Sequence, residues 1–425
     1  MGTSRKEFIK QVARGSAVIP FLSALGSLNE EISQNIESVD ASDFAALKKQ
    51  YMLADDITYL NHASIGTIPK VVHQARNKYL ELCETNPWLY MWGDGWDKPR
   101  DDVRQKTAGF LNCSPDEIAF THNTTETFNL LAQGLSIGSG DEVLFSNLNH
   151  AGASICFEKF ATQRGYTVKT FDIPLLKTPN ISKADILNLY EQHITPKTKL
   201  LVLPHIDNTV GIRHPLKEIT DLARSKGVEY IAVDAAQTVG MIPVDVQQAG
   251  IDVLATSAHK WLQAPKGIGL AYISQRIQDE LQPMWVTWGQ NQESWKGTAR
   301  IYEDYGTRNL PELLTLGSAL DFHQQIVWNK REQHLKKMWS TAQKMADKSS
   351  ATGWASPRDW ELSGSLYAIE IKNMKSGEFF QNMFDKHGFV FRPFENMGLN
   401  TVRISPNLMN TEEELNRFFE VADKI

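Results

Sequence analysis

The stretch that decides the fold reads IAVDAAQ at residues 231–237, and TSAHKW follows at residues 256–261. In both, an apolar run is followed by a charged residue, because Asp234 ends the first run and Lys260 comes after the second. The apolar residues are continuous rather than alternating, which is typical of strands that are buried on both faces of a sheet. We therefore predict strands at 229–233 and 252–256, with a carboxylate and an amine beyond their ends.

Outward from these strands, strand-like and helix-like segments alternate. We predict further strands at 117–120, 141–146, 200–203 and 268–273, the last antiparallel, and helices at 125–135, 154–164 and 216–226. This alternation indicates an open, mostly parallel α/β sheet. Ligands of such sheets bind beyond the carboxyl ends of the strands. The residues predicted at those ends are Thr121, Asn147, Pro204, Asp234 and Ser257.

The pattern changes after residue 310. We predict long helices over 311–348, short strands at 365–370, 390–392 and 401–404, and a final helix over 411–422. Thr411 and Glu414 have the spacing of a capping box at the start of that helix. The domains predicted are a large domain at 59–310, preceded by a linker or arm at 29–58, and a smaller α+β domain at 311–425.

The composition is that of a globular enzyme, with 42% hydrophobic and 22% charged residues. The net charge of -6 gives no support for a nucleic-acid partner. The three cysteines, Cys83, Cys113 and Cys156, form neither a disulfide framework nor a CxxC metal site. We therefore expect no metal site.

The N-terminus carries a candidate export signal. Residues 4–10, SRKEFIK, are similar to a twin-arginine signal in which Lys6 replaces the second arginine. The apolar stretch at 17–25 is too short to span a membrane but suits the apolar part of a signal, and small residues for cleavage lie at 24–26. We predict an export signal over 1–28 and a periplasmic protein. The alternative is an amphipathic N-terminal helix or a frayed tail on a cytoplasmic protein.

Lys260 and Asp234 are the first candidate catalytic residues. A lysine amine can form an imine once burial and neighbouring cations lower its pKa. A buried aspartate is costly unless it meets a cation, and a protonated pyridine nitrogen would be such a partner. Taken singly, Lys260 has the alternative of an ordinary surface lysine, and Asp234 that of a turn or helix-capping aspartate.

A phosphate site is predicted where Thr124 and Thr125 begin a helix, because free N–H groups and the helix dipole attract an anion there. Simple helix capping is the alternative. His150 follows a strand and can stack its imidazole on a cofactor ring, or it completes a turn. Gln237 and Asn208 also follow strands, and Gln237 is placed to reach a ring hydroxyl or the imine.

The order and spacing of these motifs resemble the fold-type I pyridoxal-phosphate enzymes. The resemblance is greatest to the class V aminotransferase family, which includes cysteine desulfurases and isopenicillin N epimerase. It covers residues 55–425 and rests on NTTE at 123–126, NHA at 149–151, HIDN at 205–208, VDAAQ at 233–237, SAHK at 257–260 and GTRN at 306–309. It implies a large, mostly parallel seven-stranded sheet domain and a smaller α+β C-terminal domain.

The resemblance also implies what each candidate residue does. Lys260 would carry the Schiff base and act as the base at the α-carbon, Asp234 would bind the pyridine nitrogen, and His150 would stack on the ring. The residues that would contact the cofactor phosphate are Thr124, Thr125, Ser257 and His259. Thr307 would reach the phosphate in the neighbouring subunit, which predicts a homodimer with shared active sites.

The substrate and the reaction are predicted from two features, the arginines of the C-terminal domain and the absence of a cysteine there. Arg403, with Arg392 as a second candidate, matches the arginine that clamps the substrate carboxylate. Cysteine desulfurases carry a nucleophilic cysteine in the C-terminal domain, and this chain has no cysteine after Cys156. The GTRN form, with Trp285 and Trp288 upstream, is closer to the isopenicillin N epimerase-like branch. The aromatic loop would either line a pocket for a bulky substrate or pack at a dimer interface.

We therefore predict a pyridoxal-phosphate enzyme that acts at the α-carbon of an amino acid or an amino-acid-derived substrate. Its reaction would be that of an epimerase, a lyase or a transaminase. The alternatives are a C–S or β-lyase, a cysteine desulfurase-like enzyme, and a non-catalytic binding protein with the pyridoxal-phosphate fold.

Overall fold

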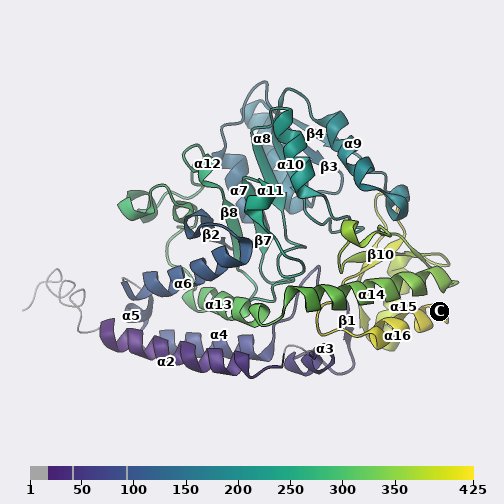
Figure 1. The fold of residues 1–425 in the computed structure, drawn as a ribbon, viewed down its shortest axis with the longest axis horizontal. Helices are drawn as coiled ribbons and strands as arrows, with labels where there is room; N and C mark the ends of the chain where they lie inside the picture. The colour runs from purple at the N-terminus through teal and green to yellow at the C-terminus, as the bar shows by residue number, and fades with distance from the viewer. Residues whose placement is uncertain (1–17, 41–42, 92–93) are drawn as a thin grey trace, which may run out of the picture.

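The computed structural model describes residues 18–40, 43–91 and 94–425. A seven-stranded sheet lies at the centre of the large domain (Figure 1), in the order β2-β8-β7-β6-β5-β3-β4. The strands are β2 Ile118–Thr121, β3 Glu142–Ser146, β4 Thr167–Phe171, β5 Thr198–Pro204, β6 Tyr230–Asp234, β7 Val253–Ser257 and β8 Gly269–Ile273. Strand β8 runs antiparallel to β2 and β7, and the pairs from β7 to β4 are parallel. The predicted large, mostly parallel seven-stranded sheet is confirmed.

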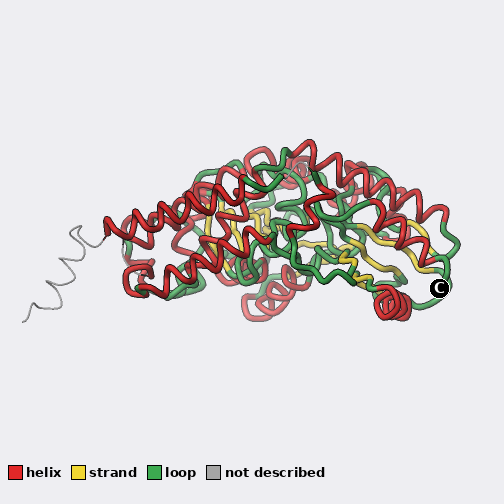
Figure 2. The backbone as a smooth tube through the Cα atoms, turned by 90° about the horizontal axis from the view of Figure 1, so that it is seen from below, coloured by secondary structure: helices red, strands yellow, loops and turns green. Residues whose placement is uncertain are grey.

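Alternate residues of each central strand enter different hydrophobic clusters, because the side chains of a strand point to opposite faces. In β6, Tyr230 and Ala232 pack with α7 Thr124–Gly134 and α8 Ala151–Arg164. Ile231 and Val233 pack on the other face. The elements that cover this second face include α4 Lys70–Thr85, α6 Asp94–Leu111, α9 Lys183–His193, α10 Leu216–Ser225 and α13 Leu310–Gln324. Figure 2 shows the strands enclosed by helices.

The edge strand β4 has no counterpart among the predicted strands. Thr167, Lys169 and Thr170 are exposed, and Phe171 is its one buried residue. An edge strand that is open to water needs no apolar run. The signal that predicted the central strands is therefore missing here.

The smaller domain is built on a four-stranded antiparallel sheet in the order β12-β13-β10-β9. Its strands are β9 Thr352–Trp354, β10 Tyr367–Ile371, β12 Arg392–Phe394 and β13 Thr401–Ile404. The helices are α14 Trp328–Lys348, α15 Ser376–His387 and α16 Glu412–Ala422. Thr411 caps α16 in the predicted capping box with Glu414. The predicted α+β C-terminal domain is thus confirmed.

Two segments connect the domains, one before the large domain in the chain and one after it. Helix α13, which the sequence assigned to the small domain, packs against α4 and α6 in the core of the large domain. Strand β1 Thr58–Tyr59 pairs in parallel with β11 Phe389–Val390, and Leu60 and Ala63 enter the core of the small domain. Residues 58–63 therefore cross from one domain to the other.

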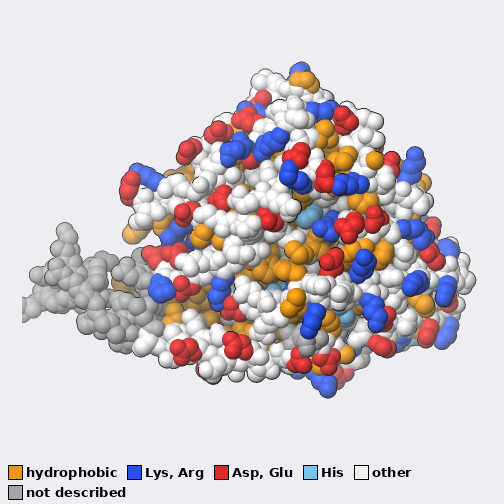
Figure 3. All heavy atoms as spheres, viewed as in Figure 1, with side chains coloured by type: hydrophobic (Ala, Val, Ile, Leu, Met, Phe, Trp, Pro, Cys, Tyr) orange, Lys and Arg blue, Asp and Glu red, His pale blue; other side chains and the backbone are white. Residues whose placement is uncertain are grey.

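Helix α2 Val18–Glu37 packs against α4 and α13 and runs across the boundary predicted at residue 28. Leu25, between the small residues of the predicted cleavage region, is buried in the main core. The SRKEFIK motif lies outside the described residues, so export stays a prediction. Within the described ranges, no helix is long and apolar enough to cross a membrane. On the face in Figure 3, acidic and basic side chains are interspersed.

Candidate functional site

A pocket lies at the carboxyl ends of β5, β6 and β7 and receives eight of the residues predicted to form the site. These are Thr124, Thr125, His150, Asn208, Asp234, Gln237, Ser257 and Lys260. Pro204, at the end of β5, also lines the pocket, whereas Thr121 and Asn147, at the ends of β2 and β3, do not. The parallel strands therefore bring together groups that lie as much as 136 positions apart, from Thr124 to Lys260.

Lys260 lies on the turn that follows β7, and two glycines allow other backbone segments to pack on this turn. A Cβ atom on Gly66 would overlap the carbonyl oxygen of Lys260, and one on Gly240 would lie 2.5 Å from the backbone nitrogen of Leu262. Gly66 also donates its N–H to the carbonyl of His259 at 2.9 Å. The backbone that carries the amine is therefore fixed on both sides.

Burial lowers the pKa of the Lys260 amine to about 8. The nearby guanidinium groups of Arg403 and Arg392 contribute to this lowered pKa, while the carboxylate of Asp234 opposes the shift. Lys260 Nζ forms no hydrogen bond or ion pair within the described part of the chain. A neutral, unengaged amine is the form that attacks a carbonyl group.

Asp234 is the last residue of β6 and is buried, with 7% of its surface exposed. Its Oδ1 accepts the N–H of Ala236 at 2.9 Å. Among the residues described, no lysine or arginine forms an ion pair with it. The local turn therefore uses one carboxylate oxygen, and the charge is left for a cation in the pocket.

The start of α7 gathers hydroxyl groups. Ser257, at the end of β7, accepts hydrogen bonds at its Oγ from the backbone N–H of Thr124 at 3.1 Å, and the two hydroxyls lie 2.9 Å apart. Asn123, not a threonine, caps α7 by accepting the N–H of Glu126. The capping alternative for Thr124 and Thr125 is thus wrong, and their hydroxyls line the pocket instead.

His150 caps a helix and also borders the pocket. It is the N-cap of α8, where its Nδ1 accepts the N–H of Gly152 at 3.0 Å. This bond requires Nδ1 without a proton and fixes the ring direction. Burial lowers the pKa of the imidazole, as do Lys260 and Arg392, against the effect of Asp234. A neutral aromatic ring therefore borders the pocket.

Gln237 and Asn208 line the pocket but are partly engaged by the protein. Gln237 donates from Nε2 to the carbonyl of Ala63 at 3.0 Å and accepts at Oε1 from the indole N–H of Trp261 at 2.9 Å. Asn208 accepts a hydrogen bond at its backbone carbonyl from Arg403 at 2.7 Å. Gln237 thus braces the Lys260 turn through Trp261.

Arg403 lies on β13 and is 1% exposed. Its guanidinium donates to the carbonyl of Asn208, to Ser64 Oγ at 2.6 Å and to Asn61 Oδ1 at 3.3 Å. No carboxylate in the described ranges forms an ion pair with it, and burial lowers its pKa to about 9. A buried cation held by neutral oxygens is a site for an anionic ligand.

Four predicted residues do not line this pocket, namely His259, Thr307, Arg392 and Arg403. His259 precedes Lys260 but does not line the pocket, and burial and the neighbouring lysines lower its pKa to about 4. Thr307 is exposed on the loop after Asp304, so it does not contact the pocket of its own chain. Trp285 and Trp288 are also exposed, at 45% and 73%, and neither lines this pocket.

The sequence reasoning did not identify the segment at 61–66 as part of the site. Asn61 and Ser64 bind Arg403, and Gly66 lies against the Lys260 turn. A signal was present, because NHASIG is a polar, glycine-ended run that follows the strand-like residues 57–60. It could not be assigned to Arg403, because these partners lie about 340 positions apart.

The pocket fits pyridoxal phosphate by the chemistry of its donors and acceptors. Thr124, Thr125 and Ser257 would hold the phosphate at the start of α7. The unpaired carboxylate of Asp234 would meet the pyridinium nitrogen, and the amine of Lys260 would meet the aldehyde.

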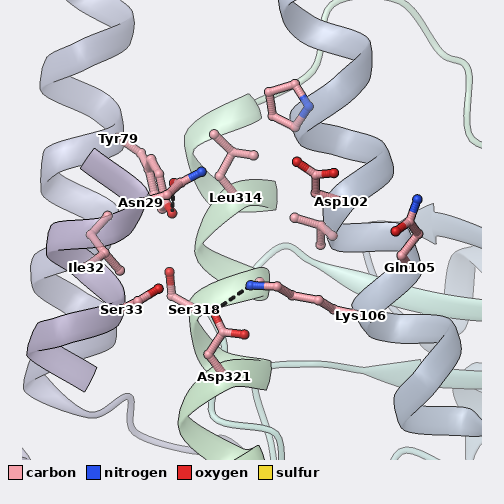
Figure 4. Close-up of a pocket in the computed structure, with 13 residues that line it drawn as sticks. Asn29, Ile32, Ser33, Tyr79, Asp102, Gln105, Lys106, Leu314, Ser318 and Asp321 are labelled. Carbon is pink, nitrogen blue, oxygen red and sulfur yellow. Dashed lines mark hydrogen bonds and ion pairs between the residues drawn. The ribbon is translucent and has the colours of Figure 1, made fainter. Parts of the chain in front are cut away.

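A separate cavity lies between α2, α4, α6 and α13 (Figure 4). Lys106 crosses it to pair with Asp321 at 2.6 Å, and Tyr79 donates to Asn29 at 2.9 Å. The Lys106 amine of this cavity is already engaged by the Asp321 carboxylate. The pocket around Lys260 is therefore the better candidate site.

Comparisons with known proteins agree with this geometry. A family model described as aminotransferase class-V matches residues 58–418. A probable cysteine desulfurase of Methanothermobacter thermautotrophicus is 28% identical over 399 residues, which cover 89% of this chain and 97% of the relative. An isopenicillin N epimerase of Amycolatopsis lactamdurans is 25% identical over 412 residues, covering 91% and 99%. A solved C-DES mutant with glycine covalently linked to the PLP cofactor has the same fold, with a TM-score of 0.76 at 21% identity, covering 89% of this chain and 99% of that one.

Proposed function

The chain belongs to the class-V aminotransferase family, and from this premise we propose that it acts at the α-carbon of an amino acid or an amino-acid-derived substrate. The chemistry proposed is that of the isopenicillin N epimerase-like branch, with pyridoxal phosphate as the cofactor. One observation carries the proposal: the Lys260 amine, with its pKa lowered to about 8, lies near the carboxylate of Asp234, which has no ion-pair partner among the described residues, and near the buried guanidinium of Arg403.

The protein groups divide the work of binding. The start of α7, with Thr124, Thr125 and Ser257, holds the phosphate, and Asp234 keeps the ring nitrogen protonated. The neutral imidazole of His150 packs against the ring. When bound, the cofactor supplies an electron-accepting ring that stabilises negative charge at the substrate α-carbon.

Lys260 and Arg403 act on the substrate. Arg403 binds the carboxylate with two parallel N–H donors, which fixes the orientation of the α-carbon. The amine of Lys260 removes the α-proton as a general base, and a pKa of about 8 suits this task near neutral pH. The face and the atom to which the proton returns decide between epimerisation and transamination, and loss of a β-substituent gives a lyase.

A C–S or β-lyase is the second candidate, because it shares these first steps and needs no thiolate from the protein. Persulfide-forming desulfuration is less well supported. Burial raises the pKa of Cys83 to about 11 and of Cys113 and Cys156 to about 12, and none of the three lines the pocket. The thiolate is the nucleophilic form of cysteine.

We also propose a homodimer whose active sites are shared. Trp285, Val286 and Trp288 are 45%, 84% and 73% exposed, and such apolar surface often marks an interface. Tyr305 packs on His122 just before α7, so the loop with Thr307 lies on the outside of the phosphate-binding segment. Thr307 would complete the site of the partner. Sedimentation of the purified protein tests this, and a monomer at micromolar concentration would contradict it.

Export through the SRKEFIK segment is proposed for localisation. N-terminal sequencing of the protein recovered from the periplasm tests it, and an intact residue 1 in a protein found only in the cytoplasm would contradict it.

The proposed activity is tested by incubating the loaded protein with a panel of L- and D-amino acids and small peptides. Deuterium exchange at the α-carbon, chirality, keto acid, ammonia and sulfide are followed together. Exchange with change of chirality favours an epimerase, keto acid alone a transaminase, and ammonia with keto acid a lyase. Lys260→Ala should abolish exchange and the visible band of the lysine-linked cofactor that borohydride removes. Lys266→Ala, at an exposed lysine of the same loop, is the matched control. Retained exchange in Lys260→Ala would overturn the assignment of the base.

A further inference from the structure

Two arginines face each other beside the pocket, and they differ in depth. Arg392 on β12 and Arg403 on β13 are direct partners in the antiparallel register. Their guanidinium carbons lie 5.0 and 5.5 Å from the centre of the same ring, that of Phe394. Arg403 is 1% exposed, whereas Arg392 is exposed to solvent. Both cations act electrostatically on Lys260, one from a buried position and the other from the surface.

Neither arginine has a carboxylate partner within the described residues. The buried carboxylate that acts on Arg403 is that of Asp207, and its oxygens accept the backbone N–H groups of residues 209, 210 and 212. Asp234 faces Lys260 and the proposed ring nitrogen. The cofactor phosphate is assigned to the start of α7, so it does not neutralise this pair.

Two adjacent like charges without an anion are unfavourable unless a ligand supplies the negative charge. A single carboxylate bound by Arg403 would compensate one guanidinium and leave the other uncompensated. The donors of Arg403 are fixed by Asn208, Ser64 and Asn61. Arg392 has no hydrogen bond to the described residues, so the parallel N–H donors of its guanidinium are available to a second group of the ligand.

We infer that the substrate carries a second anionic group on its side chain, and that Arg392 binds this group while Arg403 binds the α-carboxylate. The inference rests on the proposed function and specifies its substrate class, an α-amino acid or peptide with a side-chain carboxylate. Arg392 is then a specificity-determining residue. A neutral side chain would leave its guanidinium without a partner.

The test compares acids with their matched amides on the loaded protein. L-Aspartate, L-glutamate and L-2-aminoadipate are each titrated against the corresponding ω-amide, with dissociation constants from the change in the visible spectrum and α-proton exchange measured in parallel. At one or more chain lengths the acid should bind at least about tenfold more tightly than its amide, because a charge-assisted fork is lost in the amide. Arg392→Gln should abolish this preference by weakening the binding of the acid much more than that of the amide, and Arg392→Lys should retain part of the preference. Arg358→Gln, which removes an exposed arginine paired with Asp347, is the control and should keep the preference.

The outcomes separate this inference from the proposed function. Equal affinity for acid and amide at every length, with exchange present, would overturn the inference alone. Equal weakening of acid and amide in Arg392→Gln would also overturn it, because Arg392 would then be a second arm of the α-carboxylate clamp. Absence of both spectral change and exchange with every amino acid would refute the proposed function, and the inference with it.

Discussion

The pKa of Lys260 gives the sharpest test of the site. Burial and the two arginines lower it from 10.5 to about 8. At pH 7.5 an amine with a pKa of about 8 is about 24% unprotonated, compared with about 0.1% at a pKa of 10.5, so its reactive form is about 240-fold more abundant. The lowered pKa alone therefore raises the abundance of the unprotonated amine by about two orders of magnitude near neutral pH.

The measurement is competitive acetylation of the cofactor-free protein from about pH 6 to about pH 11, read by mass spectrometry of the peptides. Lys260 should become reactive with a midpoint near 8, and the exposed Lys266 is the internal reference. Limited access would lower the maximal rate for Lys260 without moving its midpoint.

Two substitutions test the cause of the lowered Lys260 pKa. Asp234→Asn should move the Lys260 midpoint lower, because the Asp234 carboxylate favours the ammonium form. Arg392→Gln should move it higher, because it removes a repelling cation. A Lys260 midpoint at or above about 10, or shifts of opposite sign, would refute this account of the pocket.

Three further predictions follow from single residues. Glu303→Gln should lower the free energy of unfolding by about 3 to 5 kcal/mol in urea titrations, because it removes the buried carboxylate that binds the guanidinium of Arg104. The folded pKa of Glu303 is lowered from 4.5 to about 2, so its stabilisation is present above about pH 4.5 and is lost as the pH falls towards 2; an unchanged acid-unfolding curve in the variant would contradict this. Gly152→Ala should weaken cofactor binding in equilibrium dialysis by about tenfold or more, because the new Cβ would lie 2.5 Å from Thr125 Oγ1, and wild-type affinity would argue against a phosphate site there. Arg403→Lys should raise KM with little change in kcat, because the lost fork binds ground and transition states alike; an unchanged KM would move the clamp elsewhere.

The central strands could be predicted because their residues are apolar on both faces. Ile231 and Val233 enter one core and Tyr230 and Ala232 the other, so the run in the sequence has no polar interruption. The edge strand β4 lacks this signal because water covers most of it. Helix α13 was placed with the small domain because it is buried on nearly all sides, so its sequence indicates a buried helix but not which elements it packs against.

The site was predictable where local rules apply. Parallel strands end at one edge of a sheet, so Asp234 at the end of β6 and Lys260 after β7 had to be neighbours. The function of Asn123 as the cap of α7 was missed because three adjacent polar residues, 123–125, compete for that position and only the backbone direction selects one.

By itself, the sequence determined the central strands and the helices that alternate with them, the polar residues at the strand ends, and the motifs that carry the family resemblance, because each depends on residues close together in the chain. Only the tertiary structure decided that Asn61 and Ser64 hold Arg403, that Gly66 lies on the Lys260 turn, and that Arg392 stands beside Arg403. Such contacts join segments far apart in sequence, so they exist only once both domains have packed.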